Sequence, residues 1–213
     1  MAQAENAKKL DYTPVTYDDQ YILMVNQLKK YFPIKGGLMS QTVGHVKAVD
    51  GVTFNLKRGH TMGLVGESGC GKSVTSLSLM QLLQRPQGQI VQGEIRLNLG
   101  NGKAYDVAKT PGTVMQHLRG NYISMIFQEP MTSLNPVFRI GAQIDEVIAL
   151  HDGEGKSKED IKKRTVEMLE MVGIANSQGV YEMYPHELSG GMRQRVMIAM
   201  ACLLYTSPSP RDA

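Results

Sequence analysis

The stretch GLVGESGCGKSVT, residues 63–75, decides the fold of this chain. Its glycines allow the backbone to curl, so that successive N–H groups can point inward at one ligand. A short apolar segment, Thr61–Val65, leads into the glycines and predicts a strand. The apolar run Ser73–Leu83 follows them and predicts a helix that ends at Arg85-Pro86. Strand, loop and helix in this order indicate a phosphate site, because the helix adds its positive end to the curled backbone.

The same stretch fits the P-loop pattern G-x-x-x-x-G-K-[ST] at every specified position. The side chain of Lys72 is expected to reach the β- and γ-phosphates of a nucleotide, and the hydroxyl of Ser73 to bind Mg²⁺. The side chain of Cys70 lies at an unspecified position and is interpreted as incidental. The candidate nucleotide-binding positions of the loop are Gly66, Ser68, Gly69, Cys70, Gly71, Lys72, Ser73 and Val74.

Composition narrows the class of protein. With 213 residues, 42% of them hydrophobic, and a formal charge of +3, the chain is expected to fold around a core and shows no massed basic surface for nucleic acid. Its two cysteines are far apart and fit a reducing compartment. The N-terminus lacks the apolar segment of a signal peptide, and no apolar run reaches spanning length. We therefore expect a cytosolic protein, which can still dock on a membrane protein.

The rest of the chain predicts an α/β domain. Tyr21–Val25 and Val46–Leu56 predict an antiparallel β region, with PIKGGLMSQTVG (33–44) as a long loop between them. Glu94–Leu99 predicts a strand before a Gly-Asn-Gly turn, and Tyr122–Phe127 predicts a second buried strand. From residue 140 onward the pattern is helical, including a capping box at Ser157 and Asp160 and a stop at Gly173. The expected boundaries are a leader at 1–20, a β region and first part of the core at 21–139, a helical section at 140–188, a helix at 189–201 and a tail at 202–213.

A second motif, LSGGMRQR, occupies residues 188–195. Its serine and two glycines stand at the start of a predicted helix, where backbone N–H groups have no partner within the helix and suit an anion. Taken alone, this motif also fits an ordinary helix N-cap after a loop.

Together these motifs resemble the nucleotide-binding subunit of an ATP-binding cassette (ABC) transporter. GESGCGKS is similar to the Walker A loop of that family, FQEP to its Q-loop, and LSGGMRQR to its signature motif. HVKAVDGVTF, ISMIFQEPMTSLNPVFRIGAQI and YPHELSGGMRQRVMIAMA resemble, more narrowly, the ATPases of dipeptide and oligopeptide importers. The resemblance covers residues 22–201 and implies an α/β P-loop NTPase core with an antiparallel β subdomain and a helical subdomain.

The resemblance also implies roles for single residues. Tyr31, or else Phe32, occupies the position where the family stacks an aromatic ring on adenine, although an ordinary strand-end aromatic explains it equally well. Gln128 matches the Q-loop glutamine, which contacts Mg²⁺ and the attacking water and lies at a hinge. The segment 128–138 is implied to contact a coupling helix of the membrane subunit. The catalytic candidates are Lys72 and Gln128, and the metal-binding candidates are Ser73 and Gln128.

The resemblance also implies a contact with the γ-phosphate of ATP held by another subunit, made by Ser189, Gly190 and Gly191. The implied cofactors are ATP and Mg²⁺, and the implied partners are a second ATPase subunit, favoured to be a paralogue, transmembrane permease subunits and, indirectly, a solute-binding protein. The implied location is the cytoplasmic face of the membrane, through the permease. Peptides, nickel and glutathione are all compatible substrates.

Three alternatives remain at this point. A soluble ABC-type ATPase in DNA repair or translation is disfavoured by the importer-like Q-loop region. A P-loop GTPase or small-molecule kinase is disfavoured because the chain has no Asn-Lys-x-Asp motif and those enzymes have no use for LSGGM. The last alternative is a fragment without function.

The end of the chain departs from the family. Past Ala201, Asp212 is the only acidic residue and no histidine follows His186, whereas the family continues into an apolar strand ending Asp-Glu and a later histidine. LLYTSPSPRDA resembles translated read-through of a sequencing adapter. We therefore expect residues 202–213 to be foreign, the core to be truncated before the Walker B strand, and the printed chain to bind ATP without hydrolysing it.

Overall fold

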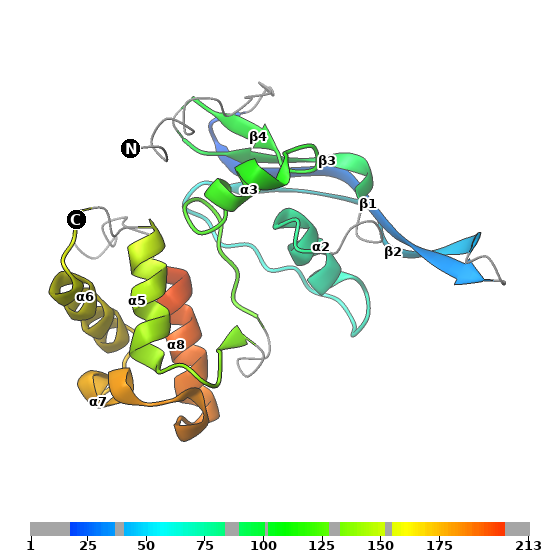
Figure 1. Ribbon diagram of the computed structural model, residues 1–213. Coiled ribbons are helices and arrows are strands. Elements are labelled where there is room, and N and C mark those ends of the chain that lie inside the picture. The colour runs from blue at the N-terminus through cyan, green and yellow to red at the C-terminus, as the bar shows by residue number, and fades with distance from the viewer. Residues whose placement is uncertain are drawn as a thin grey trace. The chain divides into compact units, whose positions relative to one another are not determined.

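The structure is a computed structural model that describes residues 18–36, 41–83, 90–100, 102–127, 133–151 and 155–202. Backbone contacts divide the chain into two compact units, Met1–His117 and Leu118–Ala213 (Figure 1). The predictions that concern the leader up to residue 17, Gln128 and the tail from residue 203 lie outside the described residues. Each unit is described by itself below.

The first unit contains a four-stranded antiparallel sheet with the strand order β2-β1-β3-β4 (Figure 1). This confirms the predicted antiparallel β region. Apolar side chains form its buried face, and they include Val25, Leu28 and Ile95, all with 0% exposure. Helices α2 and α3 also belong to this unit. The bounds are β1 Tyr21–Gly36, β2 Gln41–Lys57, α2 Lys72–Leu79, β3 Ile90–Asn98, β4 Ala104–Asp106 and α3 Gly112–Leu118.

The first two strands are much longer than the sequence indicated. The predicted long loop at 33–44 is wrong, because β1 continues to Gly36 and β2 begins at Gln41. Proline and glycine suggested a loop, but beyond Lys30 the strand β1 pairs only with β2 among the residues that the structure describes. Pro33 can therefore place its nitrogen, which has no hydrogen, at the unpaired edge.

Two further strand predictions are not confirmed. Thr61–Val65 and Tyr122–Phe127 belong to no strand, apart from an isolated bridge between Arg119 and Ile123. The side chains of Val65 and Phe127 are 90% and 40% exposed. An extended apolar segment becomes a strand only when a neighbour satisfies its backbone, and the described residues supply no such neighbour to either segment.

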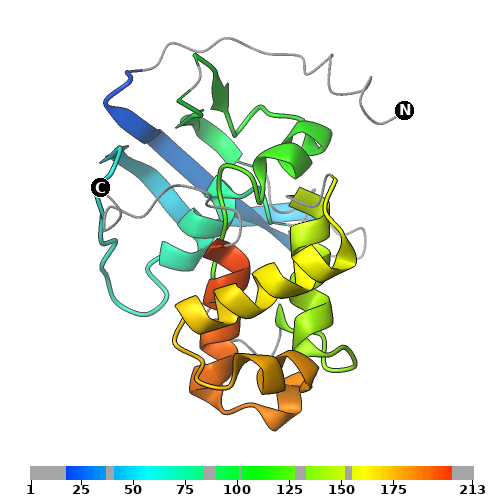
Figure 2. The same ribbon diagram turned by 90° about the vertical axis from the view of Figure 1, so that its left-hand side faces the viewer.

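The second unit is helical and confirms the change of character predicted from residue 140. Helices α5, α6 and α8 pack against one another, as the two views of Figures 1 and 2 show. Their shared core includes Ile144, Leu169 and Val196, all with 0% exposure. No helix in the described ranges combines the length and apolar content that crossing a bilayer requires. The bounds are α5 Ile140–His151, α6 Lys158–Met171, α7 Ser177–Glu182, the 3₁₀ helix η2 Pro185–Glu187 and α8 Gly190–Cys202.

The ends of α6 follow the sequence signals. The hydroxyl of Ser157 accepts from the backbone N–H of Asp160 at 3.1 Å, and the Asp160 carboxylate accepts from the backbone N–H of Ser157 at 3.1 Å. This confirms the predicted capping box. Gly173 has φ +79 just after the helix, a conformation that favours glycine and ends the helix there.

One carboxylate joins three helices of this unit. Asp145 in α5 accepts hydrogen bonds from the hydroxyl of Thr165 in α6 and from the hydroxyl of Tyr181 in α7, each at 2.5 Å. Burial raises the pKa of Tyr181 most, and the hydrogen bond from its hydroxyl to Asp145 raises it further. The ring of Tyr181 lies directly over Gly141, where an added Cβ would meet ring carbons at 2.4 to 2.5 Å. Helices α5 and α7 can approach this closely only because residue 141 has no side chain.

Candidate phosphate-binding site

The glycine loop of the first unit owes its shape to two left-handed residues. Gly69 and Gly71 have φ values of +82 and +91, which side chains rarely tolerate. A Cβ on Gly71 would also lie 2.3 Å from the carbonyl oxygen of Ala48 in β2. The loop therefore packs directly against the sheet, and Gly71 is required twice, by its conformation and by this contact.

Lys72 lies across the inside of the curled loop. Its ammonium donates hydrogen bonds to the carbonyl oxygens of Gly66 at 2.7 Å and Glu67 at 2.8 Å. The cation is thus held where the loop glycines converge. A phosphate oxygen that entered the loop would find this ammonium already in place.

The start of α2 supplies backbone donors beside Lys72. The first helical hydrogen bond runs from the N–H of Thr75 to the carbonyl of Gly71 at 2.8 Å. The N–H groups of residues 72–74 precede that bond and have no acceptor within the helix. The hydroxyl of Thr75 is used internally, on the same carbonyl at 2.9 Å, whereas Ser73 is exposed. Donors, an ammonium and an exposed hydroxyl fit a nucleotide phosphate with its Mg²⁺.

Cys70 contributes more to the loop than its unspecified position suggests. A Cβ on Gly66 would lie 2.4 Å from the Cys70 sulfur, so the thiol packs across the first glycine of the motif. The sulfur also lies 3.5 Å from the Lys72 ammonium. Sequence reasoning missed this packing, because the motif leaves the position open.

Two residues of β2, Asp50 and Lys47, contact the side chain of Tyr31 on β1. Its hydroxyl donates to the Asp50 carboxylate at 2.5 Å, which raises the pKa of Tyr31 and lowers that of Asp50. The Lys47 ammonium lies 5.6 Å from the centre of the ring. The ammonium of Lys30, a buried residue, lies 4.8 Å from the centre of the adjacent Phe32 ring. Burial lowers the pKa of Lys30. Adenine stacking by either ring remains a prediction.

The second motif begins α8 in the helical unit. The hydroxyl of Ser189 accepts from the N–H of Met192 at 3.3 Å, as an N-cap does. An added Cβ on Gly190 or Gly191 would meet nothing within 4 Å. Glycine lowers helix stability by about 0.5–1 kcal/mol relative to alanine, and no contact among the described residues requires glycine at these two positions. The backbone at the start of α8 is exposed there.

Five hydrogen bonds connect the surroundings of α8. The guanidinium of Arg195 donates a hydrogen bond of 2.6 Å to the carbonyl of Gly173, which follows the end of α6 in sequence. The N–H of Ile140, the first residue of α5, donates to the carbonyl of Met183 at 2.8 Å. The side chain of Gln143 accepts from the N–H of Asn135 at 2.9 Å and donates to the carbonyls of residues 135 and 138. The segment before α5 is thereby fastened to the helical unit.

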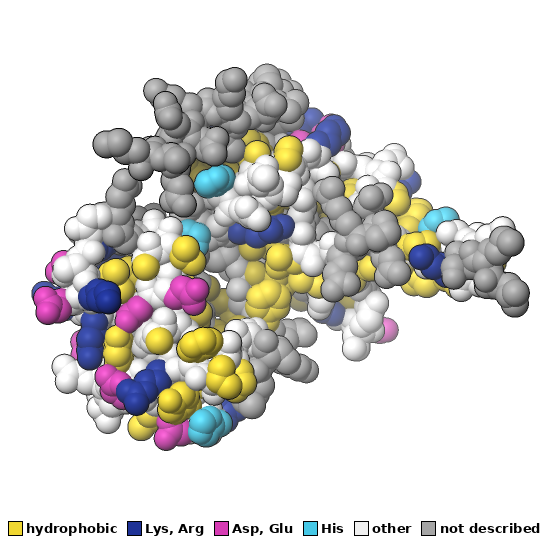
Figure 3. Space-filling view, in the orientation of Figure 1, with side chains coloured by type: hydrophobic (Ala, Val, Ile, Leu, Met, Phe, Trp, Pro, Cys, Tyr) yellow, Lys and Arg dark blue, Asp and Glu magenta, His cyan; other side chains and the backbone are white. Residues whose placement is uncertain are grey.

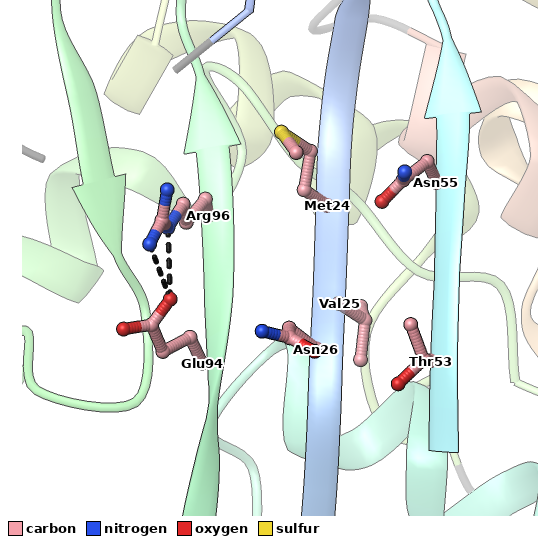
Figure 4. Close-up of a pocket in the computed structure, with 7 residues that line it drawn as sticks. All are labelled: Met24, Val25, Asn26, Thr53, Asn55, Glu94 and Arg96. Atoms are coloured by element: carbon pink, nitrogen blue, oxygen red, sulfur yellow. Dashed lines mark hydrogen bonds and ion pairs between the residues drawn. The ribbon is translucent and has the colours of Figure 1, made fainter. Parts of the chain in front are cut away.

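A depression of about 190 Å³ lies on the sheet (Figure 4). Met24, Asn26 and Asn55 line it from β1 and β2. Arg96 of β3 donates two hydrogen bonds to the carboxylate of Glu94. Its cation is already paired with an acid, so the glycine loop is the better phosphate site.

The structure brings one group of predicted site residues together. The candidates from Gly66 to Val74 form a single loop and helix start in the first unit. Ser189, Gly190 and Gly191 form the start of α8 in the second unit. Gln128 lies outside the described residues, so its role stays a prediction.

Comparisons with known proteins identify relatives of this chain. The family described as "ABC transporter" matches residues 49–207. The chain is 48% identical to the oligopeptide transport ATP-binding protein AppD of Bacillus subtilis over 180 residues, which are 84% of this chain and 51% of AppD. It is 45% identical to the glutathione import ATP-binding protein GsiA of Pectobacterium atrosepticum over 183 residues, 86% of this chain and 28% of GsiA. The chain thus spans about half of the first relative and less of the second.

The fold has solved counterparts as well. The dimeric structure of the ATP-binding cassette MJ0796 in a post-hydrolysis state, bound to ADP and phosphate, aligns with a TM-score of 0.69. The alignment covers 84% of this chain and 68% of that one, at 23% identity. At this identity the likeness shows the fold.

Proposed function

Because this chain belongs to the ABC transporter family, we propose that it is the ATP-binding subunit that powers import of peptides, or of a related small solute such as nickel or glutathione. The observation that carries the proposal is the position of Lys72. Its ammonium lies inside the glycine loop, 2.7 and 2.8 Å from two loop carbonyls, at the start of α2. This arrangement suits the β- and γ-phosphates of ATP.

The loop residues do three things when ATP enters. The ammonium of Lys72 exchanges its carbonyl acceptors for phosphate oxygens, which form stronger charge-assisted bonds. The N–H groups at residues 72–74 and the positive end of α2 hold the remaining phosphate charge. Ser73, exposed at the first turn, and Gln128 are the proposed Mg²⁺ ligands. Mg²⁺ held by these side chains would offset the negative charge that develops on the phosphate during hydrolysis.

We further propose that hydrolysis occurs at a dimer interface. Ser189, Gly190 and Gly191 are exposed among the described residues of their unit, and an added Cβ on either glycine would meet nothing within 4 Å. A γ-phosphate held by the glycine loop of a second subunit fits this surface, because glycine permits close approach of backbone N–H groups. Lys72 and Gln128 are the proposed catalytic residues, and Tyr31 is the proposed adenine contact.

The substrate class rests on the relatives. AppD is an oligopeptide transport protein and GsiA a glutathione import protein by name, and their identity to this chain supports an importer of small peptides or similar solutes. The proposed partners are a second, paralogous ATPase subunit, transmembrane permease subunits and, through them, a solute-binding protein. The proposed location is the cytoplasmic face of the membrane, through the permease.

The test is ATP binding by two lysine variants. Lys72→Ala removes the ammonium from the loop, whereas Lys103→Ala removes an exposed lysine from a turn of the same unit. Titration with a fluorescent ATP analogue in the presence of Mg²⁺ should show at least about tenfold weaker binding for Lys72→Ala, a loss of about 1.4 kcal/mol. Lys103→Ala should bind like the parent. Equal affinity in the parent and Lys72→Ala would refute the proposed site.

A further inference from the structure

The long hairpin of the first unit ends in a two-stranded arm, formed by Tyr31–Gly36 of β1 and Gln41–Lys47 of β2. We propose that the apolar face of this arm packs on the second ATP-binding subunit when two subunits close over ATP. This inference rests on the proposed function and extends its interface beyond the nucleotide. The partner surface is expected to be apolar.

The arm is isolated from the rest of the sheet. The last pair between β1 and β3 is Lys30 with Ile90, so beyond Lys30 the strand β1 pairs only with β2 in the described part of the chain (Figure 1). A two-stranded ribbon without a third strand or a covering helix is marginally stable in water. Docking on another surface would supply the missing burial.

The two faces of the arm differ in chemistry. Phe32 pairs directly with Val46, and Ile34 pairs with Gly44, so these side chains share one face. Val43 joins them, because its two methyl groups lie 3.1 Å from the place where a Cβ on Gly36 would be. Position 36 thus leaves room for Val43 to lie over the strand opposite.

The apolar face is exposed to an extent that calls for a partner. Ile34, Val43 and Val46 are 47%, 69% and 53% exposed. Yellow side chains are visible along the arm at the right of Figure 3. The pairs Tyr31 with Lys47 and Pro33 with His45 form the other, more polar face. Contiguous exposed aliphatic side chains on one face, with polar residues on the other, mark an interaction surface.

The root of the arm identifies the partner. Ala48 follows the arm directly, and its carbonyl is the group that Gly71 of the glycine loop packs against. A subunit that closes over phosphate held by this loop therefore arrives beside the root of the arm. The face consists of only a few aliphatic side chains, and the area they can bury is far smaller than the roughly 800 Å² per partner of a stable interface. It can serve only as an extension of a larger contact, which the closed nucleotide dimer provides.

The test is a triple variant of the apolar face, Ile34→Thr, Val43→Thr and Val46→Thr. Threonine keeps the branched side chain that suits a strand and adds a hydroxyl that disfavours burial. The matched control is His45→Thr, on the opposite face of the same arm. The protein is expressed from its gene together with the second ATPase subunit of the same transporter. The dissociation constant of the two subunits is measured with Mg²⁺ and a non-hydrolysable ATP analogue.

We expect the triple variant to weaken nucleotide-dependent association at least tenfold and the control to leave it unchanged. The affinity of the single subunit for ATP should be the same in all forms, which also reports that the glycine loop is intact. Equal association in the parent and the triple variant would overturn the inference while the proposed function stands. Failure of the parent to bind ATP would count against the proposed function itself. If the triple variant does not fold, Val43→Thr alone, at the most exposed position, should weaken association by about twofold to threefold, and no change there would also overturn the inference.

Discussion

Replacing the two glycines at the start of α8 should make the protein more stable and less functional at the same time. Gly190 and Gly191 are the first two residues of the helix, and a Cβ at either position meets nothing within 4 Å. Neither glycine has a positive φ. The double variant Gly190→Ala and Gly191→Ala therefore introduces no clash and no strain.

The magnitude follows from the backbone freedom that alanine removes from the unfolded chain. Gly-to-Ala changes at compatible positions stabilise proteins by about 0.4–1 kcal/mol each. Both sites lie in the first helical turn, so we expect a total of about 1 kcal/mol. For a protein of 150–250 residues this corresponds to a rise in Tm of about 2–4 °C.

Two assays separate the roles of these glycines. Thermal unfolding followed by circular dichroism, without nucleotide, should show the rise in Tm. Nucleotide-dependent dimer formation should fall at least tenfold, since two methyl groups would occupy the surface that we propose for contact with a γ-phosphate. Glu146→Ala, at an exposed position of α5 in the same unit, is the control and should leave dimer formation unchanged. A fall in Tm, or dimer formation equal to that of the parent, would refute the reasoning.

Gly141→Ala should show the opposite effect on stability, because the new methyl group would lie 2.4 Å from the Tyr181 ring and displace it. We expect a loss of about 2–3 kcal/mol in the free energy of unfolding, measured by urea titration. A loss below about 0.5 kcal/mol would contradict this packing. Asp160→Asn should destabilise the protein at neutral pH by an amount that shrinks as the pH falls through and below 3.8, the ordinary pKa of this group. The hydrogen bonds from Ser157 lower the pKa of Asp160 in the folded state, so its stabilising effect is complete above that value and is lost in acid; a difference that does not change with pH would exclude this origin.

The sequence predicted best what is encoded locally. The glycine loop, the capping box of α6 and the stop at Gly173 each depend on a few adjacent residues, and the structure has the features expected of them. The exact partners of Lys72 were beyond prediction, because hydrogen bonds to loop carbonyls depend on the folded path of the backbone.

The sequence predicted poorly what depends on distant neighbours. Thr61–Val65 has the composition of a buried strand, but a strand also needs a paired neighbour, which its own residues do not specify. The arm of the hairpin shows the reverse error. Proline and glycine at 33–37 indicated a loop, yet pairing with a second strand overrides that composition where an edge stays free. The openness of residues 190 and 191 likewise became visible only in three dimensions.

The hydrogen bonds at the start of α5 have a mechanical consequence. Gln143 clamps residues 135 and 138 to the helix, and the helix is joined through Ile140 to Met183, six residues before Ser189. A load applied to the segment before α5 is carried by backbone hydrogen bonds and a packed core, which yield little under force. We therefore expect the helical unit to move as a rigid body, so that a force on residues 135–138 moves the start of α8 with little deformation between them.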